Sequence, residues 1–261
     1  MSKFNWIDGG SVTSVPGFRA AGVTAGFKRS GAPDFAMIAS DVPANFAGAF
    51  TSCTFAAAPV QVCRKRVLES EYLRAAAINS GNANACCPQS HENAEAMSAS
   101  AAAATGREPG DFVVASTGVI GQTINISAIQ AGLPQAAAAL SADGSDAAAH
   151  AIMTTDTVKK ELAVETVIGG KTVRMGGIAT GSGMIHPNMG TMLCFLTTDC
   201  AISPEMIRAA LLETVQVSFN RISVDGDTST NDSCIVLANG LAGNAPITDK
   251  GADYQAFAEA L

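Results

Sequence analysis

The dipeptide Gly190-Thr191 has the composition of a self-cleavage site that releases an N-terminal threonine nucleophile. It follows the glycine-rich segment 181–187 and precedes the apolar run 192–196. A threonine hydroxyl is a weak nucleophile until a base lies beside it. Cleavage would supply that base, because the freed α-amine has a pKa of about 7.7 and can accept the hydroxyl proton. A glycine loop leading into a buried strand has the same composition, and on this segment alone it is the simpler explanation.

A second segment, 115–121, could stabilise a negatively charged oxygen. It follows a predicted strand and contains Thr117 and Gly118. Glycine lets the backbone approach a ligand closely, and its N–H can point at a developing oxyanion. The Thr117 hydroxyl is a second donor. Taken alone, an ordinary turn between strand and loop explains these residues as well.

Three further polar segments could line or support a site. The segment 79–85 carries three amide side chains and is expected mainly to brace a loop, whereas 154–157 could hold an amino-acid head group or cap a helix. The segment 225–232 carries three carboxylates but lacks the glycine and glutamate positions of an EF-hand, which favours a polar active-site or turn loop. The three histidines lie far apart in the sequence, so no metal site is expected.

Composition narrows the class of protein. The 261 residues, 48% hydrophobic and 15% charged, suffice for one large domain or two small ones. A net charge of −7 without a basic patch argues against nucleic acid and anionic membranes as partners. No apolar run approaches the ~20 residues of a membrane span. The seven cysteines are odd in number, show no Cys-x-x-Cys spacing and follow no signal peptide. This pattern predicts that the protein resides in the reducing cytoplasm.

The elements that must position these residues are short and mixed. Residues 1–34 are expected to be irregular, and Gly169-Gly170 predicts a hairpin between strands 162–168 and 171–175. Further strands are predicted over 35–40, 46–51, 75–79, 112–116, 192–197 and 233–237. Helices are predicted over 93–105, 126–140 with a break at Pro134, 145–153, 204–219 with Ser203 as N-cap, and 253–261. Strands and helices without regular alternation predict an α+β fold.

Taken together, these motifs resemble the ornithine acetyltransferase family (glutamate N-acetyltransferase, or arginine biosynthesis bifunctional protein). The matching segments run in family order along nearly the whole chain: 17–23, 79–86, 115–121, 151–157, 181–193 and 218–232. The resemblance implies a multilayer αββα-like α+β sandwich. It also implies self-cleavage between Gly190 and Thr191, into chains 1–190 and 191–261 that stay associated and form a larger oligomer.

The activity implied by the resemblance is acetyl transfer from N-acetylornithine to glutamate through an acetyl-Thr191 intermediate. Thr117 and Gly118 would then form the oxyanion hole, and Thr157, Thr180 and Thr191 would contact substrate. No cofactor is implied, although some family members accept acetyl-CoA as a donor.

Two departures from the family leave alternatives open. The family carries a lysine where this chain has Thr180, so a positive charge near the nucleophile is absent. Family members also continue for roughly another third of their length beyond the point that corresponds to Leu261. A truncated or degenerate paralogue without catalysis, and an amidase or aminopeptidase that uses the same threonine, therefore remain alternatives.

Overall fold

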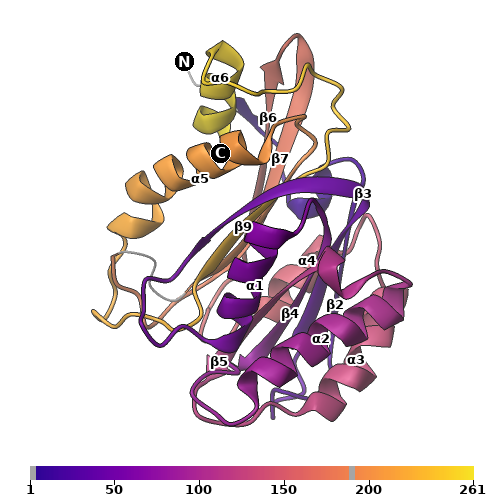
Figure 1. The fold of residues 1–261 in the computed structure, drawn as a ribbon, viewed down its shortest axis with the longest axis vertical. Coiled ribbons are helices and arrows are strands. Elements are labelled where there is room, and N and C mark those ends of the chain that lie inside the picture. The colour runs from indigo at the N-terminus through magenta and orange to yellow at the C-terminus, as the bar shows by residue number, and fades with distance from the viewer. Residues whose placement is uncertain (1–3, 188–191) are drawn as a thin grey trace.

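The computed structural model describes residues 4–187 and 192–261 (Figure 1). Its strands are β1 (Phe4–Trp6), β2 (Phe18–Val23), β3 (Phe35–Phe50), β4 (Leu73–Asn82), β5 (Phe112–Val119), β6 (Lys160–Ile168), β7 (Lys171–Thr180), β8 (Leu193–Thr198) and β9 (Ser233–Ala238). Its α-helices are α1 (Ala58–Glu69), α2 (Ser90–Thr105), α3 (Ile126–Ala138), α4 (Ser145–Ile152), α5 (Pro204–Val217) and α6 (Ala252–Ala260).

One long strand, β3, joins two sheets. Its first part pairs with β2 and β4 in a sheet that continues to β5, and residues Asn45–Phe50 pair with β9. From β9 the second sheet runs through β8, β7 and β6 to β1. The β4–β5 and β8–β9 pairs are parallel, whereas the other pairs are antiparallel.

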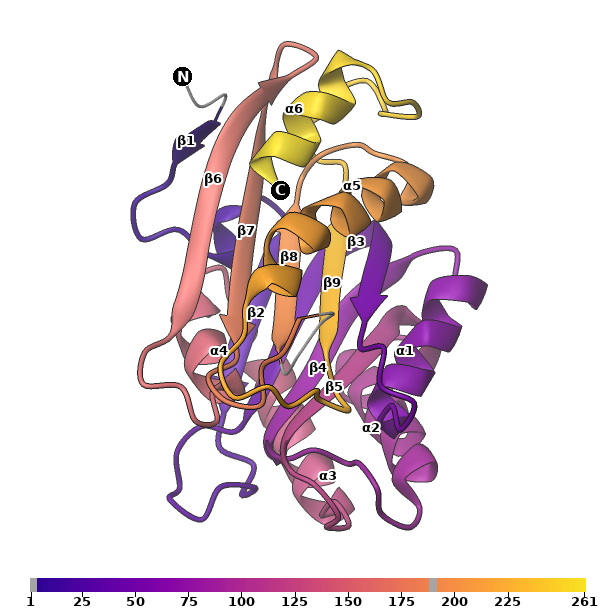
Figure 2. The same ribbon diagram turned by 90° about the vertical axis from the view of Figure 1, so that its left-hand side faces the viewer.

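Helices cover the outer faces of the two sheets (Figure 2). Along β8 and β9, Phe195 and Ile235 join the core cluster that contains the β2–β5 sheet. Cys194 and Val236, one residue away in each strand, join the cluster that contains α5 and α6. Because successive strand side chains point to opposite faces, the β8–β9 sheet lies between two apolar layers. The α+β sandwich of αββα type is thereby confirmed.

Several local predictions agree closely with the structure. The hairpin between β6 and β7 turns at Gly169 and Gly170, both at positive φ (56° and 74°), which glycine adopts without steric cost. The Ser203 side chain accepts a hydrogen bond from the backbone N–H of Met206 and so caps α5. The predicted strands and helices from residue 75 onward lie within three residues of the observed ones, except that β7 continues to Thr180, five residues past its predicted end at 175.

Other predictions were wrong. The region 1–34 contains β1 and β2, and the predicted strands 35–40 and 46–51 are one strand. Pro43 does not interrupt β3, because it lies at a shift in register where a missing N–H is tolerated. Pro134 does not break α3, because the carbonyl deprived of its partner belongs to the exposed Gln130. Helix α1, which buries one apolar face, was not predicted.

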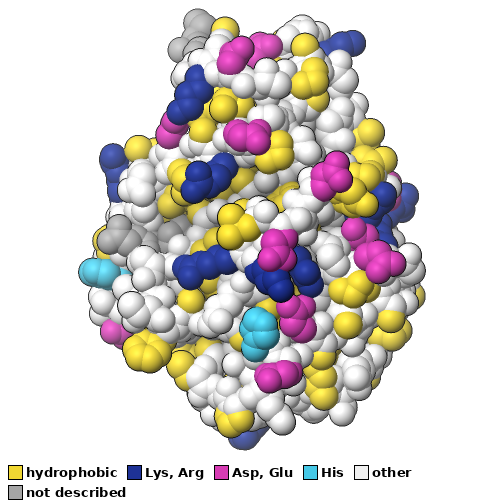
Figure 3. Space-filling model, in the orientation of Figure 1, with side chains coloured by type: hydrophobic (Ala, Val, Ile, Leu, Met, Phe, Trp, Pro, Cys, Tyr) yellow, Lys and Arg dark blue, Asp and Glu magenta, His cyan; other side chains and the backbone are white. Residues whose placement is uncertain are grey.

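On the face drawn in Figure 3, acidic and basic side chains are interspersed. Within residues 4–187 and 192–261, no helix is long and apolar enough to cross a membrane. All seven cysteines are free thiols, of which Cys86 is exposed.

Candidate active site

A cavity of about 620 Å³ lies where the ends of β4 and β5 meet four loops. Residues predicted from separate motifs meet in its wall. The lining comprises Lys28, Ser30, Gly81, Ala83, Thr117, Gly118, Val119, Ile120, Thr154, Thr155, Gly183, Met184, Asp225, Asp227, Ser229 and Asn231. This convergence of hydroxyl, backbone and carboxylate groups makes the cavity the candidate active site.

Thr117 and Gly118 come from the end of β5, where it runs parallel to β4. Gly118 pairs with Gly81, has φ of +128°, and leaves no room for a Cβ, which would lie 2.4 Å from the Gly81 carbonyl carbon. Glycine is therefore required at this position, both by conformation and by space. Thr117 is 7% exposed and lies in the cavity wall beside it. The pair can present a hydroxyl and a backbone N–H to a ligand in the cavity.

The amide-rich segment after β4 mainly holds backbone in place. The Asn79 Nδ2 group donates to the Asn82 carbonyl at 2.8 Å, and Asn84 Nδ2 donates to the Ser90 carbonyl at 2.8 Å. Asn231 does the same from the opposite loop, since its Nδ2 group donates to the carbonyls of Ala83 (2.7 Å) and Ser116 (2.8 Å). Asn231 thus fastens the 225–232 loop to the strand that carries Thr117.

Asp156 organises the 154–157 loop and the end of β7. Its buried carboxylate accepts hydrogen bonds from the backbone N–H groups of Gly181 (2.9 Å) and Thr154 (3.2 Å), from the Thr180 hydroxyl, and from Lys160. Burial alone would raise the pKa of Asp156, but the bonds from Lys160, Thr180 and the backbone outweigh it and lower the pKa. The Thr180 hydroxyl is therefore engaged with Asp156.

The threonines predicted to lie near the substrate differ in whether they line the cavity. Thr154 and Thr155 line the cavity, whereas Thr157 is exposed in the same loop and Thr180 is 3% exposed beneath it. Neither Thr157 nor Thr180 is among the described residues that form the cavity wall. A substrate role for these two side chains stays a prediction.

Gly190 and Thr191 lie outside the described residues, but both flanks of this dipeptide are held by one loop. On the N-terminal side, the Asp225 carboxylate accepts the backbone N–H groups of Met184 (2.6 Å) and Ile185 (2.9 Å). On the C-terminal side, Asp232 Oδ1 accepts the N–H of Met192 at 2.8 Å. The acidic segment that sequence analysis assigned to a turn or an active site therefore contacts both sides.

The pKa values of Asp225 and Asp232 are shifted in opposite directions. The N–H of Met184, followed by that of Ile185, lowers the pKa of the exposed Asp225. Burial raises the pKa of Asp232 to about 8, against the opposing effects of Met192, Ser229 and Thr51. Its Oδ2 atom has no well-aligned hydrogen-bond partner in the described part of the chain. An anionic group thus holds one flank and a largely protonated carboxyl holds the other near pH 7.

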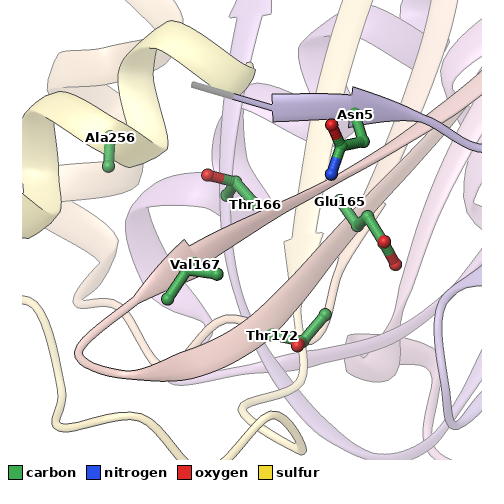
Figure 4. A pocket seen from close by; sticks show the side chains of 6 residues that line it. All are labelled: Asn5, Glu165, Thr166, Val167, Thr172 and Ala256. Atoms are coloured by element: carbon green, nitrogen blue, oxygen red, sulfur yellow. The ribbon is translucent and has the colours of Figure 1, made fainter. Parts of the chain in front are cut away.

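A second cavity, of about 340 Å³, lies between β1, β6, β7 and α6 (Figure 4). Its wall comprises Asn5, Glu165, Thr166, Val167, Thr172 and Ala256, none of which belongs to the predicted motifs. Glu165 lies 3.6 Å from Arg174 in an ion pair on the same hairpin. Nor do the residues that the structure describes include a group of three or more His, Cys, Asp or Glu side chains arranged to hold a metal ion.

Sequence reasoning missed several residues of the first cavity. Lys28 and Ser30 line it, and Asp34 supports the loop that carries them, without having been singled out, whereas Met184 and Asn231 belong to segments that were. The local signal at Lys28 is a basic residue in a region rich in glycine and serine, which is also typical of a solvated loop.

Similar proteins place the chain in a family. The ArgJ family model matches residues 19–261. The Arginine biosynthesis bifunctional protein ArgJ of Thermosynechococcus vestitus is 49% identical over 262 aligned residues, which cover 100% of this chain and 62% of that protein. The chain thus spans about 62% of the length of this relative.

Solved structures agree with this placement. The ornithine acetyltransferase of Mycobacterium tuberculosis, solved in complex with ornithine, matches with a TM-score of 0.65 and 35% identity over 72% of this chain and 99% of that chain. An aminopeptidase of Ochrobactrum anthropi, described as a variant of the Ntn hydrolase fold, matches with a TM-score of 0.56 at 12% identity over 96% and 83% of the two chains. That second likeness concerns the fold alone. From the family match and the shared architecture, the chain belongs to the ArgJ family.

Proposed function

We propose that this chain is an acetyltransferase that moves an acetyl group from N-acetylornithine to glutamate, with Thr191 as the nucleophile. One observation carries the proposal: Thr117 and Gly118 lie in the wall of the same cavity as Met184, and Met184 and Met192 on either side of Gly190-Thr191 are held by one loop. A donor pair for an oxyanion thus shares one cavity with the N-terminal flank of a candidate nucleophile, and the loop that holds this flank also holds the C-terminal one. Family membership and the ornithine complex of the Mycobacterium relative support the substrate class.

Maturation comes first in the proposed sequence. The Thr191 hydroxyl attacks the Gly190 carbonyl, the Gly190–Thr191 C–N bond breaks, and an ester forms with a free α-amine on Thr191. Water then hydrolyses the ester and releases the Gly190 carboxylate. The Mycobacterium match supports this step, because 72% of this chain covers 99% of that solved chain. A piece ending at Gly190 is close to the same share of the 261 residues.

Transfer then proceeds in two half-reactions. The α-amine of Thr191 accepts the hydroxyl proton while the oxygen attacks the acetyl carbonyl of N-acetylornithine. The Thr117 hydroxyl and the Gly118 N–H stabilise the oxyanion, and the proton passes to the departing ornithine amine. The neutral amine of glutamate next attacks the acetyl ester, which yields N-acetylglutamate and restores the hydroxyl. Acetyl-CoA is a second acetyl donor to test, and no bound cofactor is required.

Assembly and location follow the same proposal. The pieces 1–190 and 191–261 remain associated, because β8 and β9 of the second piece lie between β7 and β3 of the first within one sheet. Separating them would expose backbone hydrogen-bonding groups on both sides of this insertion. We place the enzyme in the cytoplasm as a larger oligomer acting on small molecules.

The first test is the intact mass of the purified chain after a day at neutral pH, beside a Thr191→Ala variant. Two pieces that end at Gly190 and begin at Thr191, absent from the variant, are expected. The cleaved protein is then incubated with N-acetylornithine, and a gain of one acetyl group on the 191–261 piece is expected. An uncut chain, or a cut chain that never becomes acetylated, would contradict the proposal.

Two other outcomes would identify the alternatives. Release of acetate without any need for glutamate would indicate an amidase. A stably folded but uncut chain would indicate a non-catalytic paralogue. Thr180 motivates both comparisons, because it is a neutral residue, bonded to Asp156, at the position where the family carries a lysine.

A further inference from the structure

Lys28 is the sole cation among the described residues that line the candidate active site. The other ionisable groups in this wall are the carboxylates of Asp225 and Asp227. Asp225 is occupied by the backbone of Met184 and Ile185, and Asp227 is exposed. The cavity therefore offers one positive and two negative groups, an arrangement suited to a small dipolar ligand rather than to a polyanion.

The loop that carries Lys28 is built around a buried carboxylate. Asp34 is 0% exposed, and it accepts the backbone N–H groups of Ala25 (2.6 Å), Gly26 (3.1 Å), Phe27 (2.5 Å) and Lys28 (2.9 Å). Four consecutive donors on one side chain hold this turn in a single conformation. The Lys28 backbone is thus positioned independently of any ligand.

The loop also lies directly against the end of β4, which pairs with the end of β5 that carries Thr117 and Gly118. A Cβ on Gly81 would lie 3.2 Å from the backbone of Phe27, and Gly81 pairs with Gly118. The Asp34 carbonyl accepts the backbone N–H of Ser80 at 2.8 Å, which fixes the loop to β4. The backbone of Lys28 is therefore hydrogen-bonded, through Asp34, to the strand that pairs with the one carrying Thr117 and Gly118.

The ammonium group of Lys28 has spare hydrogen-bonding capacity. It donates to the Pro33 carbonyl at 2.6 Å, while Asp34 and Asp156 act on it through charge alone. An ammonium carries three protons. Pro33 is its one hydrogen-bond acceptor among the described residues, so two protons remain for a ligand. Burial lowers the pKa of Lys28, with Asp34 and Asp156 opposing that shift, so an anion in the cavity would stabilise the charged form.

We propose that Lys28 binds the carboxylate of the N-acyl amino acid in the candidate active site, which leaves Thr117 and Gly118 to receive the acyl oxygen. This inference rests on the proposed function for the identity of the ligand. A carboxylate suits the site because it is compact and carries one charge, whereas Asp225 and Asp227 would repel a larger anion. A ligand of this class with a free amine elsewhere would also satisfy Asp227.

Equilibrium binding tests the inference without requiring turnover. The full chain carrying Thr191→Ala is titrated with N-acetylornithine and with its carboxamide, in which the carboxylate is replaced by a neutral amide. We expect the carboxylate ligand to bind about 10- to 100-fold more tightly, as for a hydrogen bond to a charged group. Adding Lys28→Met should reduce this preference to nearly one, whereas Lys28→Arg should retain much of it.

The control is Lys171→Met, at the exposed start of β7, which should leave the preference unchanged. Thermal unfolding of each variant shows whether the fold is kept. Equal affinity for the two ligands in the Thr191→Ala parent, absence of binding, or a preference that survives Lys28→Met would each overturn the inference. Failure of the proposed function would be seen separately, as absent cleavage or acetylation in the unsubstituted chain.

Discussion

The two flanks of Gly190-Thr191 use the same kind of hydrogen bond in opposite surroundings. Asp225, which is itself exposed, holds Met184 and Ile185 on the N-terminal side, and the buried Asp232 holds the beginning of a buried strand on the C-terminal side. Backbone donors lower the pKa of Asp225, whereas burial raises the pKa of Asp232 to about 8. A hydrogen bond from a backbone N–H therefore does not by itself keep a carboxyl group ionised. Desolvation of the buried carboxylate can raise its pKa by more than the hydrogen bond lowers it.

Asp232→Ala should have the largest effect. It removes the partner of the Met192 N–H inside the core and leaves a cavity, so we expect a loss of about 2–4 kcal/mol in the free energy of unfolding. Urea unfolding measures it, with Asp227→Ala in the exposed part of the same loop as control. Equal effects of the two substitutions would show that burial of Asp232 does not distinguish the flanks.

Asp232→Asn should change how stability depends on pH. The folded-state pKa is about 8, and the unfolded value is about 3.9, so between these values the folded chain binds the extra proton. Stability contributed by that proton is complete below pH 4 and is lost as the pH rises toward 8, by up to about 1.4 kcal/mol per pH unit. Asparagine cannot ionise, so the variant should lose this slope. Parallel curves for the two chains in urea unfolding between pH 5 and 7.5 would contradict the raised pKa.

Thr180→Val tests the inner support of the N-terminal flank. It removes one donor to the buried Asp156 carboxylate, which also accepts the N–H of Gly181. We expect a loss of about 1–2 kcal/mol in the free energy of unfolding, with Thr180→Ser close to the unsubstituted chain. The exposed Thr172→Val is the matched control. No loss on Thr180→Val would mean that Lys160 and the backbone satisfy Asp156 without the hydroxyl.

Asp225→Asn should have the smallest effect on stability, because Asp225 is exposed and solvent can replace part of what it provides. It should still weaken the hold on Met184 and Ile185, so we expect self-cleavage to slow by a few-fold while the urea midpoint stays nearly unchanged. The half-time of cleavage, followed by mass, measures this. A large fall in the midpoint instead would place Asp225 among the structural residues.

The elements that sequence analysis predicted well are those with a strong local signal. Two adjacent glycines predicted the turn at 169–170, and Ser203-Pro204 predicted the start of α5. The predicted break at Pro134 was wrong because the effect of a proline depends on where its missing N–H falls, here at an exposed turn of helix, and Pro43 is tolerated within β3 at a register shift for the same reason. Helix α1 could have been found from its buried Val60, Val62 and Cys63 after a proline at the first turn.

The candidate site was predicted as separate segments. Thr117 and Gly118 were identified from their types, and their place beside Met184 and Asp225 appears only in the assembled cavity. The role inferred for Lys28 depends on Asp34, a local contact within the same loop, and on Gly81, which the pairing of β3 with β4 places beside Phe27. No local pattern specifies such meetings, because they arise from the order of strands in the sheets.

The sequence by itself determined the residue types that could do chemistry, the hairpin and capped helix, and, through its motifs, the resemblance to one family. Only the tertiary structure decided that Thr180 faces Asp156, that Asp225 and Asp232 hold opposite flanks, and that Lys28 is the cation of the cavity. Turn and cap signals act over a few residues, whereas burial and charge depend on every element that packs around a side chain.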